Sequence, residues 1–287
     1  MTHKNISKNK AIIVVANGNF HGRTVTAVSM SDDSYARENF GPFLSGIELV
    51  PFNDIKALET LFRAKGDRIA SYLVEPIQGE GGVCIPDDDF LPALRQRCTE
   101  VGALLIFDEV ITGFGRTGKL FASEHWNVVP DILLVAKALG GGMPLGAFIS
   151  TPQIMATLSH DPALAHVTTF GGHPVCCAAG LASLDVIFQE NLVQQAREKG
   201  EEFVRKLKTL RGEGGCTDVR GRGLLIGMDF ATPHITQRFV QECFAHGLVL
   251  GWTLHEDTVV RLAPPLVISS EEIDRAVSIM QQILARL

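Results

Sequence analysis

Two side chains of opposite charge, Asp108 and Lys137, each follow a short apolar run of the sequence. The run from Ala103 to Phe107 ends at Asp108 and Glu109, and the run from Ile132 to Val135 ends at Lys137. Short apolar runs bounded by turn residues are typical of buried strands in a mostly parallel sheet. Such sheets bind ligands beyond the carboxyl ends of their strands, so the sequence predicts a carboxylate and an amine in one crevice.

Two interpretations of this pair are open from the residues alone. The simpler one is a salt bridge at the edge of the sheet. Alternatively, a sheltered lysine can lose its proton and form a Schiff base with an aldehyde. An aspartate in the same pocket can keep a pyridinium nitrogen protonated, so that the ring withdraws electrons. This second interpretation predicts a pyridoxal phosphate enzyme with Lys137 and Asp108 as its catalytic residues.

The sequence around the pair resembles the class III aminotransferases. The matching segments are Asp108-Glu109-Val110, Gly113-Phe114-Gly115-Arg116-Thr117-Gly118 and Lys137-Ala138-Leu139-Gly140-Gly141-Gly142. Within that family the chain is most similar to the ornithine and acetylornithine aminotransferases, from about Ile12 to the C-terminus. The resemblance implies the α/β fold of the fold-type I pyridoxal phosphate transferases. We expect a large domain with a mostly parallel central sheet at residues 1–185 and a small C-terminal α/β domain at residues 186–287.

The resemblance also implies roles for single residues. Lys137 forms the Schiff base with pyridoxal 5'-phosphate and then moves a proton between the substrate carbon and the cofactor, while Asp108 holds the pyridine nitrogen charged. Phe20 stacks on the cofactor ring, and Arg23 of the same motif meets the substrate carboxylate. The other cofactor-binding residues implied are His21, Val110, Ile111 and Thr169. From the residues alone, Phe20 could equally cover the core and Arg23 could pair on the surface.

Two carboxylates, Glu75 and Glu80, stand in a glycine-rich loop after the apolar run from Ala70 to Val74. Glycines allow a close backbone approach to a ligand, so the loop is a candidate binding element. In the ornithine branch of the family, the second glutamate pairs with a distant arginine and releases it for dicarboxylate substrates. Glu80 and Arg261 match these two substrate-binding residues, and we expect Glu75 to brace the loop.

Thr168 and Thr169 precede a helical pattern that starts at about Val175. Hydroxyl groups and free amides ahead of a helix can bind phosphate, and a plain helix cap is the alternative. In the family this pair reaches across a dimer interface, with Thr169 at the phosphate and Thr168 near the substrate. The resemblance therefore implies a homodimer with shared active sites.

The chain departs from the family pattern at two places. Ile111 stands where the ornithine branch usually has a glutamine that bonds the ring hydroxyl of the cofactor, and branches acting on β-alanine or diverse amines often carry isoleucine. The family's phosphate-binding loop and N-terminal segment normally precede the first strand, and this chain begins just before Ile12. We therefore expect an N-terminally truncated chain, either a fragment of a longer enzyme or a product with weakened cofactor binding.

Another motif suggests a different class of protein. Gly113, Gly118 and Lys119 match the spacing of a nucleotide-binding P-loop, but Leu120 replaces the serine or threonine that would hold magnesium. The apolar run before this motif ends in two carboxylates, which are poor neighbours for a triphosphate. Nucleotide hydrolysis is therefore disfavoured. A non-catalytic fragment that binds a partner but no cofactor is the other alternative to an enzyme.

The composition sets further bounds. The 287 residues are 46% hydrophobic and 20% charged, as in ordinary globular proteins, and the net charge of −6 gives no basis for a nucleic-acid or anionic-membrane surface. Six cysteines without a CxxC pair indicate reduced thiols. No apolar run has the length of a membrane span, and no signal peptide is evident. We expect a cytoplasmic enzyme with no metal site.

The combined expectation is transfer of the ω-amino group of ornithine or acetylornithine to 2-oxoglutarate. The alternative donors are 4-aminobutyrate, β-alanine and diamines, as other class III ω-aminotransferases use. The partners implied are thus a small amino donor, a 2-oxo acid acceptor and a second copy of the chain.

Overall fold

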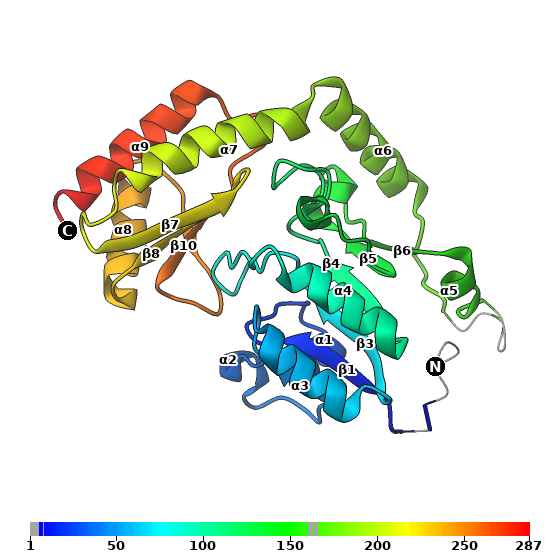
Figure 1. Cartoon of the computed structure of the whole chain (residues 1–287). Helices are drawn as coiled ribbons and strands as arrows, with labels where there is room; N and C mark the ends of the chain where they lie inside the picture. The colour runs from blue at the N-terminus through cyan, green and yellow to red at the C-terminus, as the bar shows by residue number, and fades with distance from the viewer. Residues whose placement is uncertain (1–5, 8, 160–162, 164–165) are drawn as a thin grey trace. The chain divides into compact units, whose positions relative to one another are not determined.

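The computed structural model describes residues 6–7, 9–159, 163 and 166–287, which fall into two compact units (Figure 1). The first unit comprises residues 1–76, 86–111 and 123–185, and the second comprises residues 77–85, 112–122 and 186–287. Two segments of the N-terminal half therefore belong to the same unit as the C-terminal part of the chain. The domain limits expected from the sequence stay a prediction.

A six-stranded sheet in the order β2-β1-β3-β4-β5-β6 forms the centre of the first unit. All neighbouring strands from β2 to β5 are parallel, and only β6 runs antiparallel to its neighbour β5. The strands are β1 Ile12–Ala16, β2 Ile47–Val50, β3 Ile69–Val74, β4 Leu104–Asp108, β5 Ile132–Val135 and β6 Ala147–Ser150. The mostly parallel central sheet expected from the apolar runs is confirmed.

Helices α3 (Ile55–Lys65) and α4 (Phe90–Val101) pack against each other and against strands of this sheet (Figure 1). The Asp54 side chain begins α3 by accepting a hydrogen bond from the amide of Ala57 at 2.9 Å. The remaining helices with residues in this unit are α1 Val25–Met30, α2 Ser34–Arg37, η1 Ala122–Trp126, η2 Lys137–Gly140, α5 Pro152–Ala156 and α6 Pro174–Gln189, of which η1 and η2 are short 3₁₀ helices.

The second unit is built on a four-stranded antiparallel sheet in the order β7-β8-β10-β9. The strands are β7 Cys216–Arg222, β8 Leu225–Phe230, β9 Gly251–Trp252 and β10 Val259–Leu262, and the helices are α7 Leu192–Lys208, α8 Pro233–Ala245 and α9 Ser270–Leu284. Buried residues of all three helices and of β7, β8 and β10 form one hydrophobic core. Ser269 and Glu272 exchange hydrogen bonds at the start of α9 and so form a capping box.

Glycines allow residues 112–122 to dock closely in the second unit. A Cβ atom added to Gly223 would lie 2.4 Å from the carbonyl carbon of Thr117, and one added to Gly200 would lie 2.1 Å from the Gly223 oxygen. Arg116 completes this docking because its Nη1 donates to the oxygens of Leu224 at 3.2 Å and Pro264 at 2.5 Å. The glycine-rich motif that mimics a P-loop is thus a packing element of this unit.

None of the described helices is long and apolar enough to cross a bilayer by itself. Only α6 and α7 taken together meet that length and composition, and they are bent by 63° at their junction.

Candidate active site

Asp108 is the last residue of β4, and its side chain is buried, with 7% of its surface exposed. Its Oδ1 accepts a hydrogen bond from the amide of Val110 at 3.0 Å. Its Oδ2 lies 2.8 Å from Nδ1 of His21. A carboxylate offers about four lone-pair sites, so these two contacts leave acceptor capacity for a ligand.

His21 comes from the loop after β1, whose end lies on the same edge of the parallel sheet as the end of β4. The imidazole is 2% exposed, and its Nε2 is buried without a hydrogen-bond partner among the described residues. A buried polar atom without a partner is unusual in a folded protein. The imidazole therefore contacts Asp108 through Nδ1, and its Nε2 has hydrogen-bonding capacity that the described residues do not use.

Phe20 and Glu75 fix the course of this loop. The amide of Phe20 donates to Oε2 of Glu75 at 3.1 Å, and Glu75 is a buried residue directly after β3. Glu75 therefore braces the Phe20 loop, and its bracing of the glycine-rich loop stays a prediction. Arg23 is exposed, and its guanidinium carbon lies 5.2 Å from the centroid of the Phe20 ring. Phe20 and Arg23 are thus neighbours, as a shared motif implies.

Lys137 follows β5, the parallel neighbour of β4, with Asp108 opposite Leu134 in the register. Its side chain is exposed and has no ion-pair partner within the described part of the chain. Asp108 is paired with His21, so the salt bridge between Asp108 and Lys137 that the sequence left open is not formed. The backbone φ of Lys137 is +45°, which residues other than glycine and asparagine rarely adopt. Such backbone conformations cluster at functional sites.

The glycines after Lys137 let its turn pack against α6. A Cβ atom on Gly141 would lie 2.6 Å from the oxygen of Ala179, and one on Gly180 would lie 2.7 Å from the oxygen of Leu139. The turn that sets the Lys137 backbone is therefore held by direct backbone contact with a helix. Any larger side chain at these glycines would displace the turn.

The remaining residues expected in the first unit differ in their surroundings. Ile111 is half-buried after Val110, whereas Thr168 and Thr169 are exposed. Helix α6 begins only at Pro174, so neither threonine occupies its N-cap position. The helix-cap alternative for these threonines is wrong.

Glu80 and Arg261 form an ion pair within the second unit. Nη1 of Arg261 lies 2.5 Å from Oε1 of Glu80, while Oε2 accepts a hydrogen bond from the amide of Leu254 at 3.1 Å. The Arg261 side chain is 23% exposed and the Glu80 side chain 13%, so the pair is only partly accessible to water. The pairing implied by the resemblance is present, and its role in substrate choice stays a prediction.

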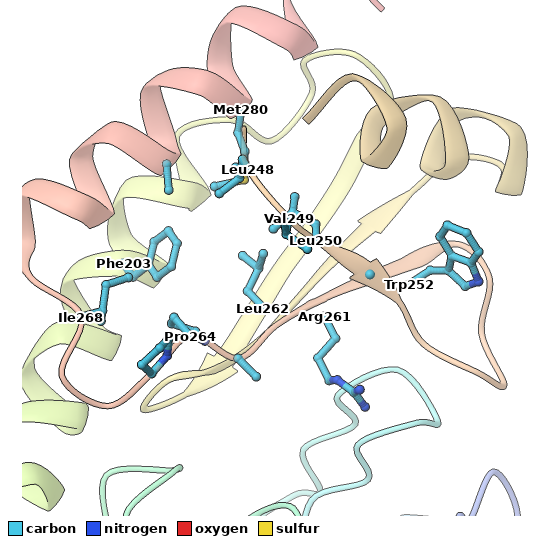
Figure 2. A pocket seen from close by; sticks show the side chains of 14 residues that line it. Phe203, Leu248, Val249, Leu250, Trp252, Arg261, Leu262, Pro264, Ile268 and Met280 are labelled. Carbon is cyan, nitrogen blue, oxygen red and sulfur yellow. The ribbon is translucent and has the colours of Figure 1, made fainter. Parts of the chain in front are cut away.

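A cavity of about 500 Å³ lies beside this pair in the second unit (Figure 2). Phe203 of α7, Leu262 of β10 and Met280 of α9 are among its apolar lining residues. Arg261 also borders the cavity, but its guanidinium extends toward the loop that carries Glu80 (Figure 2). This cavity could not be predicted from sequence patterns, because its lining comes from segments far apart in the chain.

The described residues fit pyridoxal phosphate. Asp108 offers a buried carboxylate, and His21 behind it has an unpartnered nitrogen. Lys137 presents an amine without an ion-pair partner at the end of the adjacent strand, and Phe20 supplies an aromatic ring next to His21. A ring nitrogen, a carbonyl group and an aromatic face would each find a suitable partner among these side chains.

This fold and this set of residues define a fold-type I pyridoxal phosphate enzyme. Residues 1–284 match the family model described as aminotransferase class-III. The chain belongs to that family, whose members are pyridoxal-phosphate-dependent transaminases.

Known proteins similar to the chain include the ornithine aminotransferase of Oceanobacillus iheyensis, with 43% identity over 282 residues, 98% of this chain and 68% of that protein. A structure of the Toxoplasma gondii ornithine aminotransferase, with pyridoxal phosphate at partial occupancy, aligns with a TM-score of 0.91 and 35% identity over 98% of this chain and 66% of that one. A transaminase from the marine bacterium Virgibacillus aligns with a TM-score of 0.90 and 28% identity, over 97% and 68%. The chain thus spans about two thirds of the length of these relatives.

Proposed function

We propose that the protein is an aminotransferase that moves the ω-amino group of ornithine or acetylornithine to 2-oxoglutarate with pyridoxal phosphate as cofactor. The observation that carries this proposal is the position of Asp108 and Lys137 at the ends of two adjacent parallel strands. The similarity to ornithine aminotransferases supports the choice of donor.

Asp108 has the central electrostatic role in this proposal. When bound, pyridoxal phosphate supplies a ring that withdraws electrons from the carbon bearing the substrate amine. The Asp108 carboxylate would hold the ring nitrogen in its protonated form, because an opposite charge in a buried site stabilises a cation. His21 would orient the carboxylate through its 2.8 Å contact, and Phe20 would cover the face of the ring.

Lys137 would act as the acid and base of the reaction. A primary amine at a strand end can bind a carbonyl group and then carry a proton at Nζ between two nearby atoms. The turn that packs on α6 fixes the backbone of Lys137, from which the flexible side chain extends. A well-placed general base contributes about 10² to 10⁴ in rate.

Glu80 and Arg261 would govern the choice of substrate. A transaminase of this kind must accept a cationic or neutral ω-amino donor and a dicarboxylate acceptor in the same pocket. While Glu80 pairs with Arg261, the guanidinium is neutralised, and a competing substrate carboxylate can take over the bond. Arg23 would bind the carboxylate at the other end of the donor, and Thr168 would contact the substrate.

A second candidate function is a class III ω-aminotransferase acting on 4-aminobutyrate, β-alanine or a diamine. Ile111 favours it, because an isoleucine cannot donate the hydrogen bond to a ring hydroxyl that a glutamine makes. The similarity to the Virgibacillus transaminase is compatible with this reading.

The proposal includes a homodimer in the cytoplasm. Thr169 is exposed in the single chain, as is the neighbouring Phe170 at 77%, and both would be covered if Thr169 contacts the phosphate bound by a second copy. All six cysteines are unbridged, which fits a reducing compartment.

The test is reduction with borohydride in the presence of pyridoxal phosphate, followed by peptide mapping. We expect the pyridoxyl group on Lys137 and a visible absorption band before reduction. Lys137→Ala should lose both the adduct and turnover, while Lys119→Ala serves as the control. An adduct on a different lysine would refute the assignment, and a folded dimer without any band would favour a non-catalytic fragment.

A further inference from the structure

Arg220 of β7 contacts the loop of residues 77–85, here named the Glu80 loop, with two of its nitrogens. Nε donates to the oxygen of Val83 at 3.0 Å, and Nη2 donates to the oxygen of Gly82. The third nitrogen, Nη1, lies 2.7 Å from Oδ1 of Asp229 on β8. Each guanidinium nitrogen therefore has a partner: two carbonyl groups of the loop, and the carboxylates of Asp229 and Asp218 on the sheet.

The electrostatic surroundings keep Arg220 charged. Burial lowers the pKa of Arg220 and is the largest single effect. The hydrogen bond and the charge of Asp229, with smaller contributions from Cys84 and Asp218, together exceed it, so the pKa of Arg220 is raised above its ordinary value. Asp218 contributes a weaker attraction from 3.5 Å. A permanent cation donates stronger hydrogen bonds to carbonyl oxygens than a neutral group does.

The Glu80 loop approaches the sheet more closely than a side chain at position 227 would allow. Gly227 is paired with Arg220 across β7 and β8, and a Cβ atom on it would lie 3.1 Å from Cβ of Val83. Val83 is fully buried and has a φ of +52°, which β-branched residues rarely adopt. The surrounding contacts must therefore hold this part of the loop in place.

Glu80 is joined to this anchored part by two glycines. Gly81 and Gly82 have no side chains that could restrict the backbone between Glu80 and Val83. On its other side, the Glu80 oxygen accepts a hydrogen bond from the amide of His255 at 3.1 Å. The contacts that hold Glu80 and its loop thus include two amides of the segment before β10, those of Leu254 and His255, and the Arg220 contacts.

We propose that Arg220 is a positioning residue that sets substrate selectivity by holding the Glu80 loop where Glu80 reaches Arg261. The inference rests on the proposed function of the Glu80–Arg261 pair. Within the described part of the chain, the hydrogen bonds and ion pairs of Arg220 go to backbone carbonyls and carboxylates, so it acts through Glu80. Loosening the loop would break the pair more often and expose Arg261 to dicarboxylates.

The test uses Arg220→Lys in the full 287-residue chain. A lysine keeps the charge, but a single ammonium cannot bond two loop carbonyls and Asp229 in the fork geometry of arginine. We expect glutarate, a five-carbon dicarboxylate, to bind about 3 to 10 times more tightly than to the unmodified chain, by calorimetry. The ratio of kcat/KM for glutamate over ornithine should rise in the same direction.

Three comparisons separate this role from a structural one. Glu80→Ala should produce a larger shift in both quantities, and adding Arg220→Lys to Glu80→Ala should produce no further shift. Hydrogen exchange at the amide of Cys84, which bonds the oxygen of Gln78, should accelerate in Arg220→Lys. Arg205→Lys, at an exposed position of α7, is the matched control and should change none of these.

The outcomes distinguish the two levels of the proposal. If Glu80→Ala shifts selectivity while Arg220→Lys leaves it unchanged, the role of Arg220 is refuted and the proposed function stands. An additive effect in the double variant would also overturn it. If Glu80→Ala has no effect, the proposed function of the pair fails. Should Arg220→Lys not fold, Gly227→Ala can be used instead, because its methyl group would crowd Val83 in the same loop. This variant must then produce the same shift in glutarate affinity and in selectivity.

Discussion

His21 and Asp108 are joined by a buried contact of 2.8 Å although they lie 87 positions apart in the chain. The contact aligns the loop after β1 with the end of β4, two strands away in the sheet. One carboxylate oxygen is thereby oriented by an imidazole and the other by a backbone amide. The carboxylate is fixed before any ligand binds, which is the condition for electrostatic preorganisation.

The first prediction is that Asp108→Asn lowers kcat/KM by about 10³-fold, because a neutral amide cannot stabilise a protonated ring nitrogen. His21→Asn should lower kcat/KM by less, because it removes the imidazole that orients Asp108 but keeps the charge of the Asp108 carboxylate. Steady-state kinetics with saturating pyridoxal phosphate measures both. Asp32→Asn is the control, since this exposed carboxylate bonds Asn17 and Gly18 among the described residues, away from Asp108. Unchanged activity in Asp108→Asn would contradict the assignment.

The second prediction separates the backbone of Lys137 from its chemistry. Both Lys137→Ala and Lys137→Gly should be inactive. Because φ is +45°, the glycine variant should have the higher free energy of unfolding, by about 1 kcal/mol. Urea denaturation gives the difference. In an unstrained helical position the alanine variant would instead have the higher free energy of unfolding by a similar amount. A more stable Lys137→Ala would therefore show that the backbone at this position is not strained.

Much of the fold follows from local sequence signals. The apolar run from Ile132 to Val135 corresponds to β5 with the same limits, and the run from Ala70 to Val74 corresponds to β3 within one residue. Both have the spacing of their element and turn residues at their ends. Strand β9 was not predicted, because a two-residue edge strand has no periodicity and is defined only by its pairing with β10.

The contacts within the site were less accessible from the sequence. The bond between His21 and Asp108 and the fork of Arg220 on the Glu80 loop depend on how distant segments meet in space. Hydrophobic patterns specify which face of an element is buried, but they do not specify side-chain partners across the fold. The Glu80–Arg261 pair could be expected only from the resemblance to a family.

The third prediction concerns Glu80→Ala. Without the glutamate, Arg261 stays exposed, so the variant should process glutamate better and the ω-amino donor worse, by roughly 10 to 100-fold. Half-reaction rates with ornithine, acetylornithine, 4-aminobutyrate and glutamate measure this. Glu213→Ala, at an exposed position, should leave all four rates unchanged. Equal loss on all four substrates would mean that Glu80 is only structural, and a preference for 4-aminobutyrate would favour the second candidate function.

The fourth prediction concerns shared active sites. If Thr169 serves the site of the partner subunit, Thr169→Ala and Lys137→Ala chains should each have low activity alone. Mixed dimers should recover up to half of the activity of one normal dimer, because one of the two sites then has both residues. Activity after mixing, unfolding and refolding measures this. No recovery in verified mixed dimers would rule out a shared site.

The fifth prediction is that the thiols of Cys216 and Cys243 resist alkylation at pH 9. Burial raises the pKa of Cys216 to about 11 and that of Cys243 to about 12. At most about 1% of either thiol is then ionised in the folded chain, and the thiolate is the reactive form. Both retain protons that the unfolded chain releases from pH 9 upward, so stability should fall between pH 9 and pH 12. Cys243→Ala should reduce that fall.

The Arg220 contacts also bear on the order in which the protein can be made. Arg220 and Val83 are separated by 137 positions, and Glu80 and Arg261 by 181. At the usual pace of 5 to 20 residues per second, a ribosome needs roughly 7 to 30 s to reach Arg220 after it has added Val83. During synthesis the Glu80 loop is therefore made before either Arg220 or Arg261 can contact it, and the proposed effect of the Glu80–Arg261 pair on selectivity requires both arginines.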